Sequence, residues 1–283
     1  MAPPGTKRIA AGVATCLTVA AILALSPARF ESPATAEPAP RAPANTGEPA
    51  GPGFLIDLRD GHDRRTQYLA DYEMNEGWIK IAYSPRNIRF GKDGMTLELI
   101  KTKGRLPFSG SEWQRTGVYG YGRYEAVLKA SGEEGAVTSF FTYTGDYWGD
   151  PHDEIDFEFV ASKPNEVHLN YFRDGRDDAI DIPLWFNTSS GYHLYAFEWS
   201  PDVIRWYVDG VKIHEVTAAA AKAGIPTTTG RVVANLWAGS GAATGWTGEP
   251  RFTVARAVFR CVSHVPARQV GPQCSDTFEP PTR

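Results

Sequence analysis

A short acidic segment, residues 152–159, alternates carboxylate side chains with large apolar ones. Its acids at every second position are Glu154, Asp156 and Glu158, and the residues between and after them are Ile155, Phe157 and Phe159. Successive side chains of a β-strand point to opposite faces, so this period of two predicts a strand with one acidic and one apolar face. A solvated strand face is the alternative to a functional site, although like charges in line are unfavourable there.

The spacing of Glu154 and Glu158 suits the chemistry of a retaining glycosidase. Residues four apart on a strand have Cα atoms about 13 Å apart, and side chains that each lean inward by about 4 Å bring the carboxyl groups to the roughly 5 Å that this reaction needs. One carboxylate must attack the anomeric carbon while the other carboxyl protonates the leaving oxygen, so their pKa values must differ. Asp156, between them, could raise the pKa of the group that stays protonated. The spacing leaves open which glutamate has which role.

The elements that must position these acids are short strands separated by Gly, Asp, Asn and Pro. The expected strands are 95–100, 124–128, 137–143, 154–160, 167–172, 192–199 and 231–236. Asp209-Gly210 predicts a hairpin turn between strands 204–208 and 211–216. The one expected helix is Thr217–Ala223. Many short strands in one domain predict an all-β fold, a sandwich of jelly-roll type.

The amino-terminal 53 residues read as two segments that precede the folded domain. Lys7 and Arg8, an apolar run from Ile9 to Leu25 and the small residues around Ala36 predict a secretory signal peptide over residues 1–36, with a membrane anchor as the alternative. Residues 37–53 are rich in Pro, Ala and Gly and predict a linker. We therefore expect one folded domain over residues 54–283, in a protein that is secreted or periplasmic.

Composition restricts the partners. The formal net charge of −4 and the lack of a long basic run argue against nucleic acid and an anionic membrane surface as partners, so a neutral polymer is compatible with the chain. Cys261 and Cys274 are expected to form a disulfide, worth about 3 kcal/mol in the chain-entropy model. No cysteine-histidine metal pattern is present, no cofactor is expected, and a monomer is the default.

The acidic segment resembles the signature of glycoside hydrolase family 16, Glu-aliphatic-Asp-x-Glu, in its form without an extra residue. Four further stretches carry the likeness: Tyr119–Glu125, Ser139–Gly145, Trp206–Gly210 and Asn235–Trp237. The resemblance covers most of residues 77–246. Within the family, the sequence is similar to the lichenases and to the bacterial exopolysaccharide glycanases. The resemblance implies a curved, concanavalin A-like jelly roll of two antiparallel sheets, with a polysaccharide substrate bound in a cleft on the concave face.

The resemblance also implies roles for individual residues. Glu154 is then the nucleophile, Glu158 the general acid and base, and Asp156 the assisting acid. The residues implied along the cleft are Glu112, Phe141, Tyr143, His152, Asn170, Asn235 and Trp237. Phe141 and Trp237 could instead be core residues, since aromatic side chains on strands usually are. His152 could be read as part of a metal site, but no second histidine stands at ligand spacing.

Departures from the family pattern bear on the substrate. Gln114 and His152 replace an arginine and a tryptophan of mixed-linkage lichenases, which favours a succinoglycan-like exopolysaccharide beside β-1,3-1,4-glucan. The last strand, 254–260, lacks the aspartate of the family's structural calcium site, which puts that ion in doubt. We expect a secreted retaining endo-β-glycanase. The alternatives are a transglycosylase that uses the same acids and a noncatalytic glycan-binding lectin.

Overall fold

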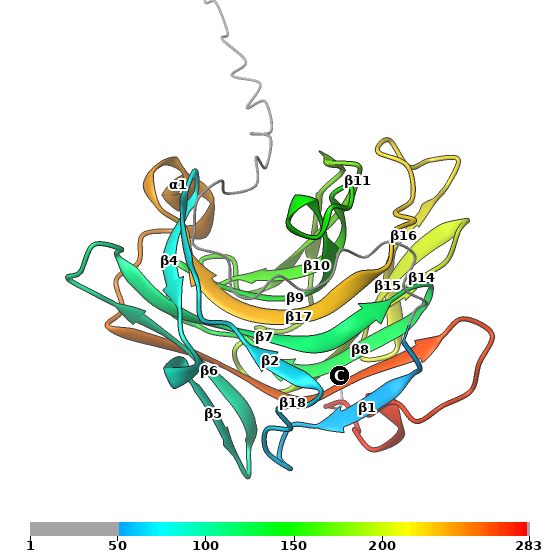
Figure 1. Ribbon diagram of the computed structural model, residues 1–283, viewed down its shortest axis with the longest axis horizontal. Coiled ribbons are helices and arrows are strands. Elements are labelled where there is room, and N and C mark those ends of the chain that lie inside the picture. The colour runs from blue at the N-terminus through cyan, green and yellow to red at the C-terminus, as the bar shows by residue number, and fades with distance from the viewer. Residues whose placement is uncertain (1–50, 282–283) are drawn as a thin grey trace, which may run out of the picture. The chain divides into compact units, whose positions relative to one another are not determined.

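The computed structural model describes residues 51–281 of the 283-residue chain, and these residues form two layers of β-strands (Figure 1). The first nine strands are β1 Phe54–Asp57, β2 Gln67–Leu69, β3 Glu73–Glu76, β4 Ile79–Tyr83, β5 Ile88–Gly91, β6 Gly94–Lys101, β7 Phe108–Tyr119, β8 Gly122–Lys129 and β9 Ala136–Thr144. The other nine are β10 Asp153–Val160, β11 Glu166–Arg173, β12 Arg176–Asp177, β13 Ile180–Pro183, β14 His193–Trp199, β15 Val203–Val208, β16 Val211–Thr217, β17 Gly230–Ala238 and β18 Val254–Pro266.

Helical structure within the described residues is limited to single turns. The α-helix α1 spans Thr244–Thr247, and four 3-10 turns are η1 Pro85–Asn87, η2 Asp146–Trp148, η3 Gly241–Ala243 and η4 Cys274–Asp276. Residues 51–281 therefore form an all-β unit, as the strand pattern of the sequence predicts.

One layer, sheet B, contains the acidic strand. Its strands pair in the order β11, β10, β9, β17, β7 and β2, all antiparallel, and β12 and β13 pair with the other edge of β11. β10 thus lies inside the sheet with a partner on each side. The second layer, sheet A, runs β16, β15, β14, β8 and β18, and β18 also pairs with β1 and β6.

The long strand β7 joins the two layers. Its first residues pair with β4 and β6 of sheet A, and its later residues pair with β17 and β2 of sheet B. The pairing of β4 with β7 is parallel, the one parallel pair among the described strands, so the expectation of purely antiparallel sheets needs this correction. Figure 1 shows both layers curved in the same sense, with β17 and β7 on the inner side of β8 and β18.

The hydrophobic core lies between the two sheets. From β10, Phe157 and Phe159 point into it and are at most 1% exposed. They meet aromatic rings of β14: the centroid of Tyr195 lies 5.6 Å from that of Phe157 and 4.5 Å from that of Phe159. The acids of β10 consequently face away from sheet A, on the concave side of sheet B. The predicted curved two-layer β-sandwich is confirmed.

Two local predictions had opposite outcomes. The hairpin is confirmed: Asp209 and Gly210 adopt positive φ angles of 50° and 78° between β15 and β16, as a tight hairpin turn requires. The helix predicted over Thr217–Ala223 is wrong. Thr217 pairs with Val203 and extends β16, and the following residues form turns. A seven-residue helix has too few internal hydrogen bonds to be stable by propensity alone.

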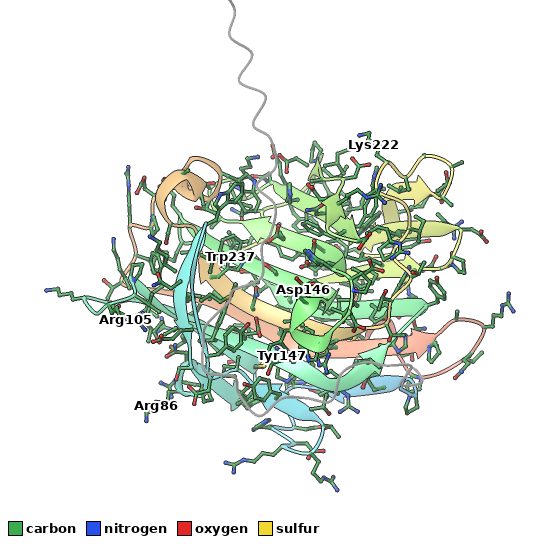
Figure 2. The ribbon with its side chains drawn as sticks, turned by 45° about the horizontal axis from the view of Figure 1, so that its top comes forward. Arg86, Arg105, Asp146, Tyr147, Lys222 and Trp237 are labelled. Carbon is green, nitrogen blue, oxygen red and sulfur yellow. A yellow bond between two sulfur atoms is a disulfide. The ribbon has the colours of Figure 1, made fainter. Side chains whose placement is uncertain are left out.

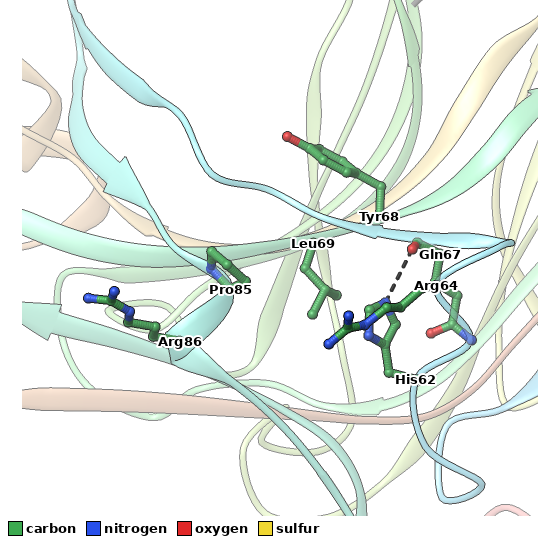
Figure 3. A pocket seen from close by; sticks show the side chains of 7 residues that line it. All are labelled: His62, Arg64, Gln67, Tyr68, Leu69, Pro85 and Arg86. Carbon is green, nitrogen blue, oxygen red and sulfur yellow. Dashed lines mark hydrogen bonds between the residues drawn. The ribbon is translucent and has the colours of Figure 1, made fainter. Parts of the chain in front are cut away.

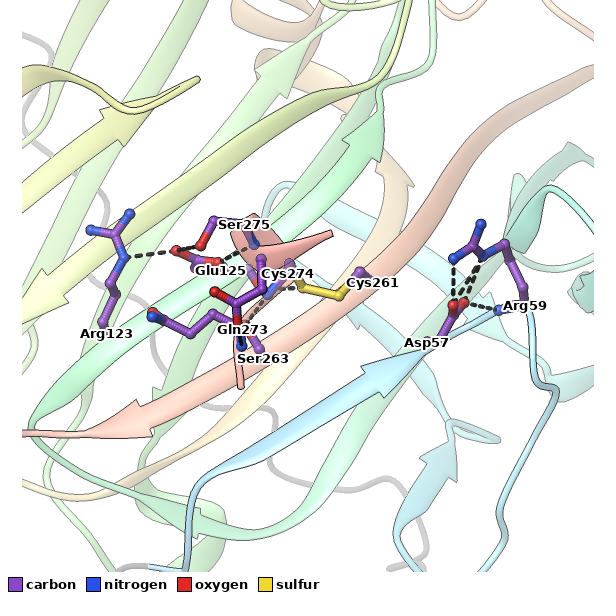
Figure 4. Close-up of a disulfide and its surroundings, with 10 residues drawn as sticks. Asp57, Arg59, Arg123, Glu125, Cys261, Ser263, Gln273, Cys274 and Ser275 are labelled. Carbon is purple, nitrogen blue, oxygen red and sulfur yellow. Dashed lines mark hydrogen bonds and ion pairs between the residues drawn. A yellow bond between two sulfur atoms is a disulfide. The ribbon is translucent and has the colours of Figure 1, made fainter. Parts of the chain in front are cut away.

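The carboxyl-terminal segment is fastened to the outer face of sheet A (Figure 4). A disulfide joins Cys274 of η4 to Cys261 of β18, with Cα atoms 5.8 Å apart. Beside it, the fully buried carboxylate of Glu125 on β8 accepts hydrogen bonds from the amide and hydroxyl of Ser275 and from Arg123. The buried charge of Glu125 is thus paired with Arg123, next to the carboxyl-terminal segment that contacts it.

The predicted signal peptide, residues 1–36, and most of the predicted linker, residues 37–53, lie outside the described residues. The first strand of the described region begins at Phe54. None of the helices in residues 51–281 has the length and apolar character needed to cross a membrane.

Candidate active site

The three acids of β10 lie side by side on the concave face of sheet B, which we call the acid face. Asp156 is buried, whereas Glu154 and Glu158 are partly exposed. The alternation that points them to this face sends Ile155 and Phe157 into the core, where both are fully buried. The core anchoring of the apolar residues thereby fixes the direction of the acids.

Strand register places the other predicted site residues on the same face. Side chains directly across from each other on antiparallel strands share a face. Glu154 is paired with Tyr143, and Asp156 with Phe141 on one side and Asn170 on the other. The row through Glu158 continues from β9 to β17 and β7 as Ser139, Asn235 and Glu112. Trp237 follows Asn235 by two residues on β17.

Glu158 lies in surroundings that favour its protonated form. Ser139, directly opposite it on β9, donates a hydrogen bond to its carboxyl group. Burial and the nearby charge of Glu154 outweigh this bond and raise the pKa of Glu158 to about 8, although part of the residue is accessible from the acid face. The indole N–H of Trp237 donates to the Ser139 hydroxyl at 3.2 Å and holds it in place. At neutral pH this carboxyl group carries a proton that it can donate.

Asp156 is the most enclosed of the three acids. Burial and the charges of Glu154 and Glu158 raise its pKa well above the usual range, and it is hydrogen-bonded to Glu154. The indole N–H of Trp206, from sheet A, donates to the Asp156 backbone carbonyl at 3.2 Å. A protonated Asp156 donates a hydrogen bond to the Glu154 carboxylate, which reduces the charge gathered on this strand.

Glu154 is held from its other side by His152. The Nε2 atom of His152 lies 2.6 Å from Oε2 of Glu154, so the imidazole N–H donates to the carboxylate. The imidazole stacks on Phe172 with centroids 4.3 Å apart and meets the edge of Tyr143 at 5.3 Å. Two donors, Asp156 and His152, thus orient the Glu154 carboxylate, whose side chain stays 16% exposed.

Glu112 of β7 forms a second polar group across the sheet. Its carboxylate accepts hydrogen bonds from the Tyr72 hydroxyl at 3.0 Å, the Gln114 amide at 2.8 Å and Asn235. Burial nevertheless raises its pKa. The side-chain carbonyl of Asn235 is buried with no hydrogen-bond partner among the described residues. A buried acceptor of this kind is normally satisfied by a donor, and the hydroxyl group of a ligand would serve.

Asp153, which the sequence reasoning missed, fixes the beginning of β10. Its carboxylate is nearly fully buried and accepts from the backbone amides of Asp174, Thr227 and Thr228 and from the guanidinium of Arg173. These groups belong to the β11–β12 turn and to the loop before β17, so one carboxylate ties together the segments that border Glu154. Its position next to Glu154 was visible in the sequence, but its partners lie far away along the chain.

Aromatic side chains that the sequence reasoning also missed stand at two places on the acid face. Trp148 meets the edge of Tyr143 at 5.6 Å, and Tyr147 meets Trp148 at 5.1 Å. Trp246 lies 6.1 Å from Trp237. Tyr147 and Trp237 are seen at separate positions in Figure 2, so the two aromatic groups are distinct.

The described residues contain no group of three or more His, Cys, Asp or Glu side chains suited to hold a metal ion. The acid face offers three carboxyl groups, and two of them, Asp156 and Glu158, have raised pKa values. Hydrogen-bonding amides and aromatic faces lie beside them. This combination suits acid-base and nucleophilic attack on a sugar acetal.

Comparison with known families decides what kind of protein carries this site. The family model described as glycosyl hydrolases family 16 matches residues 75–255, which include the acid strand and all the predicted catalytic and cleft residues. The chain belongs to glycosyl hydrolase family 16. As a family 16 member it is a glycoside hydrolase, and the resemblance drawn from the sequence is confirmed.

Family 16 relatives agree over the same region. A β-glucanase from Paenibacillus macerans is 39% identical over 180 residues, covering 63% of this chain and 74% of that protein. A β-glucanase from Bacillus licheniformis is 42% identical over 173 residues, covering 61% and 69%. Among solved structures, a prokaryotic β-1,3-1,4-glucanase (lichenase) derived from a mouse hindgut metagenome is 31% identical with a TM-score of 0.71, covering 76% of this chain and all of that one. The family 16 jelly roll is confirmed by this likeness.

Proposed function

We propose that this glycoside hydrolase cleaves β-1,3-1,4-linked glucan within the chain, with retention of configuration at the anomeric carbon. The observation that carries the proposal is the pairing of a partly exposed Glu154, held by His152, with Glu158, whose pKa is raised to about 8. The β-glucanases that resemble the chain support the substrate class. A succinoglycan-like exopolysaccharide is the second substrate to be tested, because Gln114 and His152 depart from mixed-linkage lichenases.

The first step uses the two glutamates in different protonation states. The Glu154 carboxylate attacks the anomeric carbon, and the glycosidic C–O bond breaks as Glu158 gives its proton to the leaving oxygen. A glycosyl ester on Glu154 results. The raised pKa of Glu158 keeps its proton available at neutral pH, and the hydrogen bonds from His152 and Asp156 aim the Glu154 oxygens.

The second step reverses the role of Glu158. Now a carboxylate, it removes a proton from a water molecule whose oxygen attacks the anomeric carbon, and the bond to Glu154 breaks. The product keeps its original configuration, and both glutamates return to their starting states. A sugar hydroxyl in place of water would give transglycosylation, so the fate of the ester separates the two activities.

The remaining acid-face residues are proposed to bind the polysaccharide. Aromatic rings of Phe141, Tyr143 and Trp237 would lie against sugar rings, whose C–H faces are apolar. Asn235 offers sugar hydroxyls a carbonyl that has no hydrogen-bond partner within residues 51–281, and Glu112 offers them a carboxylate. Asn170 faces the same side beside Asp156.

Export is proposed from the predicted signal segment, residues 1–36. The proposal places the enzyme in the periplasm or outside the cell, where polysaccharides of this class occur. Expression of the full chain followed by amino-terminal sequencing of the mature protein tests it. An intact amino terminus in the cytosol would contradict export.

Product analysis tests the proposed activity. The mature protein, its Glu154→Gln variant and the control Glu133→Gln, which alters an exposed glutamate in the turn before β9, are incubated with mixed-linkage β-glucan, laminarin, xyloglucan and succinoglycan. We expect short oligosaccharides with the initial β configuration from mixed-linkage glucan, and a loss of at least about a thousandfold in Glu154→Gln alone. Undiminished cleavage by that variant, or products with inverted configuration, would reject the mechanism.

A further inference from the structure

A pocket of about 530 Å³ lies at the edge of sheet B, apart from the three acids (Figure 3). Its lining residues are His62, Arg64, Gln67, Tyr68, Leu69, Pro85 and Arg86, and we call it the edge pocket. They come from the loop before β2, from β2 itself and from η1. In Figure 3 the ring of Tyr68 lies on one side of β2, while Arg64, His62 and Leu69 lie on the other.

The strand β2 offers unused backbone groups to this pocket. Among the described strands β2 pairs with β7 alone, so no described strand covers its other edge. The Thr66 carbonyl accepts from Thr116, and the Ala70 amide donates to Glu112, which places the even-numbered residues in hydrogen-bonded pairs with β7. The amide and carbonyl of Leu69 must then point away from β7, toward the pocket. The Gln67 carbonyl, on the same edge, is taken by His62 at 3.2 Å.

The charge of the edge pocket is positive. Arg64 and Arg86 are exposed, and neither has an ion pair within residues 51–281, whereas their neighbours Arg65 and Arg89 are paired with Asp63 and Glu98. Asp63 is engaged further by the Thr66 hydroxyl at 3.1 Å. The pocket therefore presents guanidinium and amide donors, with Asp63 already occupied and Asp71 beside Tyr68.

Tyr68 connects the edge pocket to the acid face. Its register partner is Gln114 on β7, and that row of side chains continues through Val233 and Phe141 to Asp156. Four strand spacings of about 4.8 Å separate Tyr68 from Asp156, roughly 19 Å in all. Tyr68 is 36% exposed. A polysaccharide that runs across the strands from the acids to β2 would pass over the ring of Tyr68 at the edge of the sheet.

We propose that the edge pocket binds a carboxylate-bearing substituent of the polysaccharide, so that the enzyme favours an acidic glucan over a neutral one. Arg64, with Arg86 at the far wall, supplies the positive charge, and the open amide of Leu69 supplies a further donor. Tyr68 carries the sugar chain across the edge strand. This inference rests on the proposed function, because it assumes a glucan chain on the acid face.

The test compares one glucan in two charge states. Initial rates are measured with mixed-linkage β-glucan and with the same polymer after partial carboxymethylation, for the wild type, Arg64→Gln, Arg64→Gln/Arg86→Gln and Arg64→Lys. The matched control is Arg65→Gln, next in the chain but paired with Asp63. The measured quantity is the ratio of KM for the carboxymethylated polymer to KM for the neutral one, which cancels any general loss of activity.

We expect this ratio to rise up to about fivefold in Arg64→Gln, and further in the double variant, in keeping with a partly exposed ionic contact. Arg64→Lys should keep much of the preference for the carboxymethylated polymer, and Arg65→Gln should keep all of that preference. In about 1 M salt, where the Debye length is about 3 Å, the wild-type preference should disappear.

An unchanged ratio in both arginine variants would overturn the edge-pocket proposal while leaving the proposed function intact. The same rise in Arg65→Gln would overturn it too, since general surface charge would then suffice. Failure of the wild type to cleave either polymer would instead count against the proposed function, so the two failures are distinguishable.

Discussion

Ser139 lies directly opposite Glu158 in the β9–β10 pair and donates a hydrogen bond to its carboxyl group. The bond lowers the pKa of Glu158, whereas burial and the charge of Glu154 raise it, and the balance stands at about 8. The same hydroxyl accepts from Trp237. One serine thus connects the proposed general acid to Trp237 of β17.

The pKa of Glu158 predicts how kcat/KM falls at high pH. The proposed mechanism requires a protonated Glu158, so kcat/KM should be high at neutral pH and fall as the pH rises through about 8. In Ser139→Ala the bond that favours the carboxylate is gone, so the midpoint should move to higher pH. The measurement is kcat/KM on mixed-linkage β-glucan from pH 5 to 10.

The control for this profile is Ser131→Ala, which removes a hydroxyl bonded to the Glu133 amide in the turn before β9. Its midpoint should equal that of the wild type. A basic limb that stays in place in Ser139→Ala would mean that another group sets it.

The raised pKa also predicts a pH-dependent stability. A carboxyl group whose folded pKa exceeds its unfolded value of 4.5 is unfavourable when ionised in the fold, so its destabilising effect appears between pH 4.5 and about 8 and is complete above that range. Glu158→Gln removes this ionisation. The variant should therefore unfold at a higher temperature than the wild type at pH 9, with the difference shrinking toward pH 4.

Thermal unfolding followed by circular dichroism at several pH values checks this expectation. Glu133→Gln, at an exposed turn position, should show no such pH dependence relative to the wild type. A Glu158→Gln variant that gains stability equally at pH 4 and pH 9 would contradict the electrostatic explanation.

His152 is expected to orient Glu154 without contacting the bond that breaks. In His152→Phe the ring stack on Phe172 is retained but the 2.6 Å hydrogen bond to Glu154 is lost. A charge-assisted bond of about 1.5 kcal/mol corresponds to roughly a tenfold loss of kcat. KM should change much less, because in the proposed mechanism the Glu154 carboxylate attacks the anomeric carbon and does not bind the distant sugars.

Steady-state kinetics separate these two parameters. His152→Gln, which keeps a donor at this position, should recover part of the loss. Equal losses in the Phe and Gln variants would show that ring packing, and not the hydrogen bond, matters at position 152.

Replacement of Asp153 is expected to lower the stability of the protein. Asp153→Ala leaves the amides of Thr227 and Thr228 and the guanidinium of Arg173 without their acceptor, and unsatisfied buried donors cost about 1–3 kcal/mol each. The free energy of unfolding should fall by about 3 kcal/mol or more. Asp174→Asn, in the adjacent turn, keeps the Asp153 carboxylate and tolerates the positive φ of 53° at this position, so it serves as control. Denaturant unfolding measures both variants.

The sequence by itself determined the features that depend on neighbours along the chain. Alternation over residues 152–159 is enough to place Glu154, Asp156 and Glu158 on one face, because successive side chains of a strand point to opposite sides. Asp209-Gly210 is enough for a hairpin, because tight turns need positive φ angles. The all-β class follows from many such local signals, and family membership from motifs that keep their order along the chain.

The tertiary structure decided what depends on register between distant strands. Only the pairing of β9, β10, β17 and β7 places Ser139 beside Glu158, and Asn235 beside Glu112. The helix expected at Thr217–Ala223 gave way because pairing with Val203 was available. The partners of Asp153 and the two arginines of the edge pocket come from loops and turns that lie far apart along the chain, so only the folded arrangement shows them together.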